Sequence, residues 1–215
     1  MSRVIRVLLA DDHASMRDGM RLVLEIGGTI SVVGAAADGS EAIREAARLV
    51  PDVVVMDIAM PEVNGIDAIE AIRTRNPETR VVILSMHLDA AYVRRALRAG
   101  ASGYLLKESA GSEVAEAVRA VHGGQRYLSS AVASVLADDV AAPGAESKLD
   151  ALSMRERHVL QQLAEGRTSA EIAQRLSLSP KTVETYRSRL MRKLEMDDIA
   201  SLVKFAIRHG LTTLD

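Results

Sequence analysis

The sequence predicts an α/β protein in two parts: a five-stranded, doubly wound parallel sheet, followed by a small all-α domain of four helices. Three observations predict this organisation. Short apolar runs alternate with segments of helical spacing over residues 1–122. Residues 138–147 then have the Ala-, Pro- and Gly-rich composition of a linker. Four capped helical segments follow, and 215 residues are enough for two small domains.

The expected strands are short, mainly apolar runs. Parallel strands that are buried on both faces read as continuous Val, Ile and Leu, much as residues 53–56 do. The five runs are Val4–Ala10, Ile30–Ala36, Asp52–Met56, Arg80–Ser85 and Ser102–Leu106, and the helical segments cover about 14–26, 39–49, 65–75, 90–99 and 110–121. In such sheets, ligands bind beyond the carboxyl ends of the strands.

The second part of the chain carries strong helix-capping signals. Residues 123–148 are expected to be a linker with a short helix at about 129–136, between a domain at 1–122 and another at 149–215. Two segments begin with capping boxes, at Ser153–Glu156 and Thr168–Glu171, and end near Gly166 and Leu176. The third begins at Ser179-Pro180 and runs to about Leu194, and the fourth spans about Asp198 to Arg208.

Composition narrows the class of protein. With one Phe, four Tyr and no Trp, the core must be aliphatic, and the lack of Cys excludes disulfides and thiolate metal sites. We find no signal peptide and no membrane-length apolar stretch, so we expect a soluble, cytoplasmic protein. The net charge of −2 conceals a basic segment, since residues 153–194 hold nine bases and four acids. This segment suggests a polyanionic partner.

Polar residues follow the apolar runs where a doubly wound sheet brings strand ends together. Asp11 and Asp12 follow the first run, and Asp57 follows the third. Ser85 ends the fourth run, and Lys107 follows the fifth. Neighbouring carboxylates would repel one another unless a hard cation such as Mg²⁺ joins them, which would leave Asp57 free to attack phosphorus. Each residue alone is more typical of a helix cap or a surface, but the ordered set is specific.

Residues 4–121 resemble the receiver domain of bacterial two-component response regulators, which has a flavodoxin-like fold. The resemblance rests on Ala10-Asp11-Asp12-His13, on Met56-Asp57-Ile58-Ala59-Met60-Pro61-Glu62-Val63-Asn64-Gly65, on Leu84-Ser85 and on Gly103-Tyr104-Leu105-Leu106-Lys107. It implies that a histidine kinase phosphorylates Asp57. It also implies that Asp12, Asp57 and the Ala59 carbonyl bind Mg²⁺, that Asp11 helps through water, and that Ser85, Tyr104 and Lys107 form the switch. Ser85 replaces the Thr that is common in the family.

The third C-terminal helix is expected to read DNA. Its apolar residues Val183, Tyr186, Leu190 and Leu194 should pack inward. Lys181, Glu184, Thr185 and Ser188 fall on the opposite face, which would enter a major groove. Glu184 could accept a hydrogen bond from a cytosine amine. The candidate DNA-binding residues are Lys181, Thr182, Glu184, Thr185, Arg187, Ser188, Arg189, Arg192 and Lys193.

Residues 152–211 resemble a LuxR-type helix-turn-helix. The matching segments are Leu152–Arg157, Leu163–Gly166, Glu171-Ile172-Ala173 and Ser179–Tyr186, although Thr168-Ser169-Ala170 lacks the basic residue often found before Glu-Ile-Ala. This resemblance implies sequence-specific DNA binding, usually as a dimer. With the receiver-like part it indicates the NarL/FixJ class of response regulators. For a dimer we expect two inverted half-sites about one helical turn apart.

The expected mechanism is a phosphorylation switch. A phosphoryl group on Asp57 draws Ser85 and Lys107 toward it, Tyr104 shifts inward, and the basic domain is released, dimerises, or both. An aspartyl-phosphate phosphatase is the enzymatic alternative, but Ala59 stands where such enzymes need a second acid, so we expect no enzyme. A regulator with a vestigial Asp57 is the other alternative. RNA binding is disfavoured because no stacking aromatics accompany the basic helix, and the five histidines show no metal-binding spacing.

Overall fold

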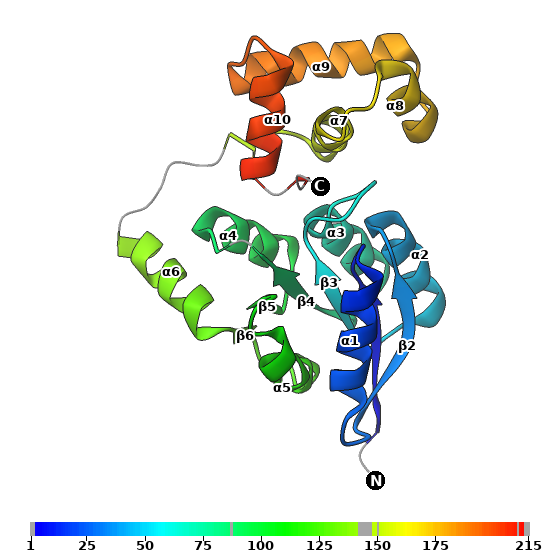
Figure 1. Cartoon of the computed structure of the whole chain (residues 1–215), viewed down its shortest axis with the longest axis vertical. Helices are drawn as coiled ribbons and strands as arrows, with labels where there is room; N and C mark the ends of the chain where they lie inside the picture. Colours follow the sequence, from blue (N-terminus) through cyan, green and yellow to red (C-terminus); the bar gives the residue numbers. More distant parts are fainter. Residues whose placement is uncertain (1–2, 87, 142–147, 150, 210, 213–215) are drawn as a thin grey trace. The chain divides into compact units, whose positions relative to one another are not determined.

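The computed structural model describes residues 3–86, 88–141, 148–149, 151–209 and 211–212. The chain divides into two compact units (Figure 1): an N-terminal unit, Met1–Pro143, and a C-terminal unit, Gly144–Asp215. The described residues contain no helix long and apolar enough to span a bilayer.

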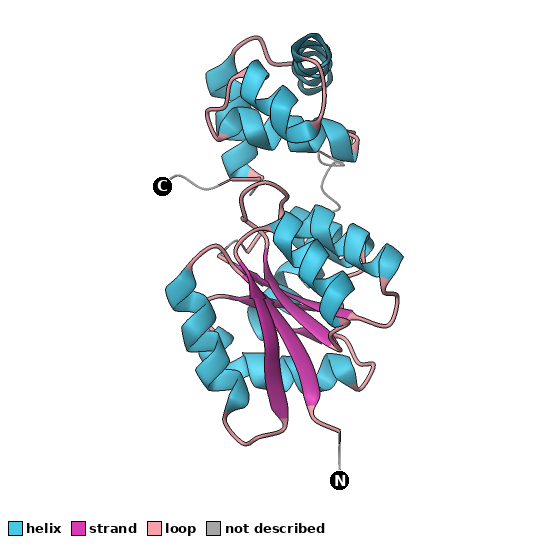
Figure 2. Ribbon diagram, turned by 90° about the vertical axis from the view of Figure 1, so that its right-hand side faces the viewer, coloured by secondary structure: helices cyan, strands magenta, loops and turns pink. Residues whose placement is uncertain are grey.

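The N-terminal unit is built on a parallel sheet with strand order β2-β1-β3-β4-β5-β6. The predicted doubly wound arrangement is confirmed, and Figure 2 shows the strands enclosed by helices on both sides. The strands are β1 Ile5–Ala10, β2 Ile30–Ala36, β3 Val53–Asp57, β4 Arg80–Ser85, β5 Gly103–Leu106 and β6 Tyr127–Leu128. The helices are α1 Ala14–Glu25, α2 Gly39–Leu49, α3 Gly65–Arg75, α4 Ala90–Ala99, α5 Ala110–His122 and α6 Ser130–Ala141.

Alternate residues of the strands enter two apolar layers, as the period of a strand requires. On one face, Val54 and Met56 pack with residues of α2, α3 and α4. On the other face, Val53 and Val55 pack with residues of α1 and α5. Since both faces are covered, every residue of β3 is buried, and polar chemistry is left to the ends of the strands.

The sheet has six strands, one more than the sequence predicted. Residues 123–141 fall in the expected linker, and the short helix expected at about 129–136 is present as α6, but β6 and α6 belong to the N-terminal unit. The amide of Tyr127 donates to the Ser102 carbonyl at 3.1 Å, and that of Ser129 donates to the Tyr104 carbonyl at 3.2 Å. Helix α6 contacts α4 and β5 and buries Val132 completely. A strand of two residues is too short to give a pattern, which is why the sequence did not reveal it.

Four helices form the C-terminal unit around an apolar core of their own: α7 Met154–Ala164, α8 Ser169–Leu176, α9 Pro180–Leu194 and α10 Ile199–Arg208. Both predicted capping boxes are present, at Ser153 and Thr168. The predicted cap of α9 is also present, with the Ser179 side chain accepting from the Thr182 amide ahead of Pro180. The inward face predicted for α9 is confirmed, because Val183, Leu190 and Leu194 are buried in this core and Tyr186, which is half-buried, packs against it.

Candidate phosphoryl-transfer site and DNA-binding surface

Two acids and a lysine meet at the carboxyl edge of the sheet. Asp11 follows β1, Asp57 ends β3 and Lys107 follows β5. The Lys107 Nζ lies 2.8 Å from Oδ2 of Asp11 and donates a hydrogen bond to Oδ2 of Asp57, also at 2.8 Å. All three side chains are less than a tenth exposed. The ammonium group therefore holds two buried carboxylates together, and we call this set, with Asp12, the acidic edge.

The loop after β3 is shaped closely around Asp57. The Ala59 amide donates to Oδ1 of Asp57 at 3.3 Å, and the Gly65 amide donates to the Ile58 carbonyl at 2.8 Å. A Cβ at Gly65 would lie 2.1 Å from the Asp57 carbonyl oxygen, so only glycine fits there. Asn64 caps α3 by accepting from the Asp67 amide. These contacts fix the backbone beside the Asp57 carboxylate.

Burial and charge act in opposite directions at this edge. Burial disfavours the ionised carboxylate and raises the pKa of Asp57, and Asp11 adds to the shift although Lys107 opposes it. Burial also opposes the charge of Lys107, but Asp57 and Asp11 outweigh it, so the pKa of Lys107 is raised. Lys107 therefore stays protonated, and one ammonium compensates two carboxylates.

Asp12 has a different neighbour, His13, for which the sequence predicted no metal-binding role. Its Oδ1 lies 2.6 Å from Nδ1 of His13, and that nitrogen is 3.3 Å from Oδ1 of Asp11. The charge of Asp12 is the main reason that the pKa of His13 is raised. Asp11, Asp12 and His13 each place a potential ligand atom within 4.8 Å of the others. Direct adjacency to the acid pair was the available signal for His13.

The acid pair fits a hard cation. Oδ2 of Asp11 and Oδ1 of Asp12 are buried, and each has a close nitrogen: Nζ of Lys107 for Asp11 and Nδ1 of His13 for Asp12. Buried carboxylate oxygens with spare acceptor capacity suit Mg²⁺, which prefers oxygen ligands and takes only one or two carboxylates.

Ser85 and Tyr104 lie together on adjacent strands. Their hydroxyl groups share a hydrogen bond, and burial raises the pKa of Tyr104 to about 12. Tyr104 is fully buried and Ser85 nearly so. From the sequence we expect Tyr104 to move inward on phosphorylation, whereas this structure already holds it inside. The sequence grouped both residues with Asp57 as a switch, which stays a prediction, and it gave no contact between them.

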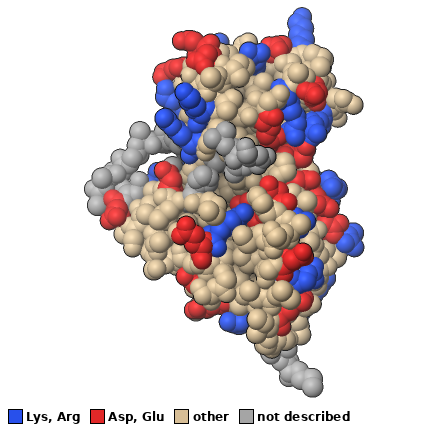
Figure 3. All heavy atoms as spheres, viewed as in Figure 1, with Lys and Arg blue, Asp and Glu red and all other residues tan. Residues whose placement is uncertain are grey.

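The predicted DNA-binding residues lie on α9, and Figure 3 shows Lys and Arg gathered over the C-terminal unit at the top of the view. Seven of the nine are exposed, while Thr182 and Arg187 are half-buried. Lys193 has internal partners, since its Nζ donates to Glu156 at 2.7 Å and to the Ala151 carbonyl at 3.1 Å. The Glu184 carboxylate accepts from the Ser169 hydroxyl of α8.

Comparison with known proteins agrees with this geometry. Residues 7–119 match the response regulator receiver domain, and residues 150–206 match the bacterial regulatory proteins of the luxR family. The chain is 39% identical to the transcriptional regulatory protein MctR of Rhizobium johnstonii and 38% identical to the response regulator UvrY of Escherichia coli, over 97% of this chain and 96% of each relative. A structure of RcsB from Salmonella enterica serovar Typhimurium, bound to promoter rprA in the presence of phosphomimetic BeF3-, matches with 27% identity and a TM-score of 0.67 over 94% of this chain and 98% of that one.

The fold, the acidic edge and the helix-turn-helix define a response regulator of a two-component system. The chain belongs to the NarL/FixJ class, in which a receiver domain precedes a LuxR-type DNA-binding domain, and it is a transcriptional regulator.

Proposed function

We propose that a partner histidine kinase switches this regulator by phosphorylating Asp57. The observation that carries the proposal is the position of the Lys107 ammonium, 2.8 Å from carboxylate oxygens of both Asp57 and Asp11. In the transfer, an Asp57 oxygen forms a bond to phosphorus, the bond from phosphorus to the kinase histidine breaks, and that imidazole keeps the electron pair. Lys107 then turns from pairing with the carboxylate to pairing with phosphoryl oxygens.

We further infer that Asp11, Asp12, Asp57 and the backbone carbonyl of Ala59 hold Mg²⁺, with Asp11 acting through water. When bound, the ion neutralises charge on the incoming phosphoryl group. The spare acceptor capacity of Asp11 and Asp12 supports this ligand set. The Ala59 amide, which donates to Oδ1 of Asp57, orients the carboxylate so that Oδ2 faces Lys107.

The response begins at Ser85. A phosphoryl oxygen on Asp57 competes with Tyr104 for the Ser85 hydroxyl, which now hydrogen-bonds the Tyr104 hydroxyl of the neighbouring strand. The rearrangement promotes dimerisation and DNA binding through the exposed face of α9, where Lys181, Thr185 and Ser188 would meet inverted half-sites. Because internal partners hold Lys193, we assign it a supporting role in the fold of the C-terminal unit.

The test compares DNA affinity with and without acetyl phosphate. DNA sites are first selected from genomic fragments with the wild-type protein. We expect acetyl phosphate to raise the affinity of the wild type and of Asp18→Asn, a control that removes an exposed acid of α1. Asp57→Asn and Asp57→Ala should not respond. Equal affinity of all four proteins under both conditions would refute the switch, and a response that survives in both Asp57 variants would refute the assigned phosphoacceptor.

A further inference from the structure

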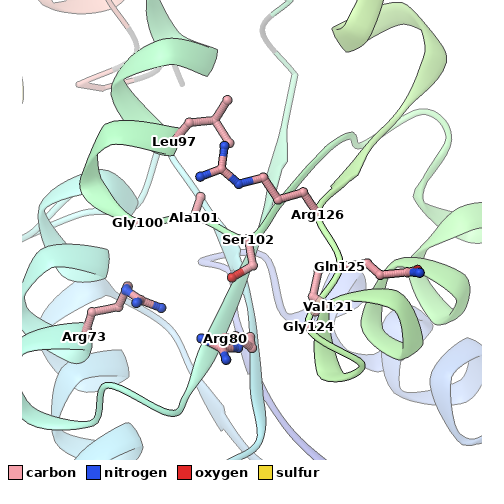
Figure 4. A pocket seen from close by; sticks show the side chains of 10 residues that line it. All are labelled: Arg73, Arg80, Leu97, Gly100, Ala101, Ser102, Val121, Gly124, Gln125 and Arg126. Atoms are coloured by element: carbon pink, nitrogen blue, oxygen red, sulfur yellow. The ribbon is translucent and has the colours of Figure 1, made fainter.

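A pocket lies at the edge of the sheet opposite the acidic edge. Its walls come from the ends of α3, α4 and α5, the start of β4 and the turns before β5 and β6 (Figure 4). Strand β4 begins in the pocket at Arg80 and ends at Ser85, so about 16 Å of strand, at about 3.3 Å a residue, separates the two places. The pocket is therefore distinct from the phosphorylation site, and it encloses about 250 Å³.

Three arginines line this pocket, and we call it the arginine pocket. They are Arg73 from α3, Arg80 from β4 and Arg126 from the turn before β6. No acid is among the lining residues, and none of the three guanidinium groups has a hydrogen bond or ion pair with another described residue. Figure 4 shows the Ser102 hydroxyl in the middle of the view with the three guanidinium groups around it.

The backbone at Gly100 leaves room for one of these side chains, and its conformation there is constrained. Gly100 has φ +106°, which favours glycine, and a Cβ there would lie 2.5 Å from Cδ and 2.7 Å from Nε of Arg73. The Arg73 side chain therefore lies directly over Gly100. The backbone thus leaves room for Arg73, whose guanidinium group has no partner among the described residues and is available to a ligand.

The negative ends of the nearby helix dipoles are not enough to balance the charges of three arginines. Arg73 lies in the last turn of α3, where the dipole favours a positive charge, but Arg80 and Arg126 lie outside any helix. Three helix C-termini together contribute roughly −1.5 charge units, at about −0.5 each. This leaves a substantial part of the three positive charges uncompensated.

We propose that the arginine pocket binds a diphosphate group, either as inorganic pyrophosphate or as the end of a nucleotide. Guanidinium groups match phosphate oxygens with two parallel hydrogen bonds, and the Ser102 hydroxyl can donate a further one. The three arginines come from separate elements, and two linked phosphate groups offer oxygens in more directions than one group does, so they can pair with all three. Sites for drug-sized ligands enclose about 300–1,000 Å³, so this smaller pocket suits a compact anion.

The test is a titration of the full chain with sodium pyrophosphate in metal-free buffer at physiological salt, followed by amide chemical shifts. We expect one site per chain with a dissociation constant below about 1 mM. The shifts should concentrate at Gly100, Ser102 and Gln125. Sulfate at equal ionic strength should bind at least about tenfold more weakly, because it offers fewer charge-assisted hydrogen bonds.

Matched variants locate the site. Arg80→Gln and Arg126→Gln should each weaken pyrophosphate binding by about tenfold or more, which corresponds to losing one charge-assisted hydrogen bond. Arg126 is exposed in a turn, so its variant should fold even if Arg80→Gln does not. Arg75→Gln removes the same charge from an exposed position at the end of α3, outside the pocket, and should bind as the wild type does.

Other results would show whether the diphosphate group belongs to pyrophosphate or to a nucleotide, or would overturn the proposal. Tighter binding of ADP than of pyrophosphate would identify a nucleotide as the source, and equal binding would show that the diphosphate group suffices. Shifts confined to α9 or to the surroundings of Lys107, or binding that survives in Arg126→Gln, would refute the assigned site. Binding of a glutamate-rich peptide without binding of pyrophosphate would replace the proposal with a protein partner.

Discussion

The most informative perturbation of the acidic edge is Lys107→Met, which keeps most of the apolar stem and removes the ammonium group. Asp11 and Asp57 each place an oxygen 2.8 Å from Nζ, so these two oxygens lie no more than twice that distance, 5.6 Å, apart. Without the ammonium, two ionised carboxylates at that separation repel by about 3 kcal/mol at an effective dielectric constant of about 20. Removing one partner of a buried ion pair typically costs about 3–5 kcal/mol.

Protonation of Asp11 or Asp57 sets an upper limit to the stability that Lys107→Met can lose. One carboxyl can take up a proton, and for a group with an unfolded pKa near 3.9 that costs about 4 kcal/mol at pH 7, at about 1.4 kcal/mol a pH unit. In the variant, the folded-state pKa of a carboxyl is raised above its unfolded value. The folded state is therefore penalised as pH rises above the unfolded pKa, and the penalty disappears below it. We expect Lys107→Met to lower the free energy of unfolding by about 3–4 kcal/mol at pH 7 and by almost nothing near pH 4.

Amide hydrogen exchange in β3 and β4 measures this difference, because those strands report the opening of the N-terminal unit alone. Lys107 is the only lysine in residues 1–143, so the control is another cation, Arg3, whose side chain is 76% exposed. Arg3→Met should cost less than about 1 kcal/mol at every pH. A loss at Lys107 that does not change between pH 7 and pH 4.5 would show that packing, not charge, is responsible. A loss below about 1 kcal/mol would refute the bridging role altogether.

Three other substitutions test separate parts of the structure. Glu156→Gln should lower the stability of the C-terminal unit by about 2 kcal/mol at pH 7, because the buried carboxylate pairs with Lys193 at 2.7 Å. Burial opposes its charge, but Lys193 and Ser153 outweigh burial and lower the pKa of Glu156. This contribution should therefore decline as pH falls below the unfolded pKa and vanish below the lower folded-state pKa, as exchange in α7 would show. Asp67→Ala removes a buried carboxylate 3.3 Å from Arg95 and should cost about 3 kcal/mol in urea unfolding; a loss under about 1 kcal/mol would contradict this. Val132→Ala should cost about 2 kcal/mol and speed exchange in α6, whereas unchanged exchange would mean that α6 does not depend on this contact.

The sequence predicted the acidic edge well because local patterns determine strand ends. Buried runs placed Asp11 and Asp57 at the ends of β1 and β3, and the topology of a doubly wound sheet makes those strands neighbours. It did not predict which groups touch. Lys107 bridges two acids, and Asp12 contacts His13, because side-chain length and burial decide those contacts after the backbone is in place.

The features that the sequence did not reveal depend on residues far apart in the chain. The arginine pocket combines Arg73, Arg80 and Arg126, and none of the three stands out in its own segment. Lys193 was predicted to bind DNA because it lies on a basic helix, yet its partner Glu156 is 37 residues away. The capping box at Glu156 was visible because its residues are three apart, whereas the long-range ion pair was not.

The added strand and helix change the route by which a signal can leave the receiver. Tyr104 has two kinds of partner: its hydroxyl group hydrogen-bonds Ser85, and its carbonyl accepts from the Ser129 amide at the start of α6. Because β5 has only four residues, a change that moves Tyr104 also moves its pairing with β6. Val132 of α6 packs in the same apolar cluster as Tyr104. We therefore expect a rearrangement at Asp57 to reach β6 and α6 through side-chain packing and backbone pairing together.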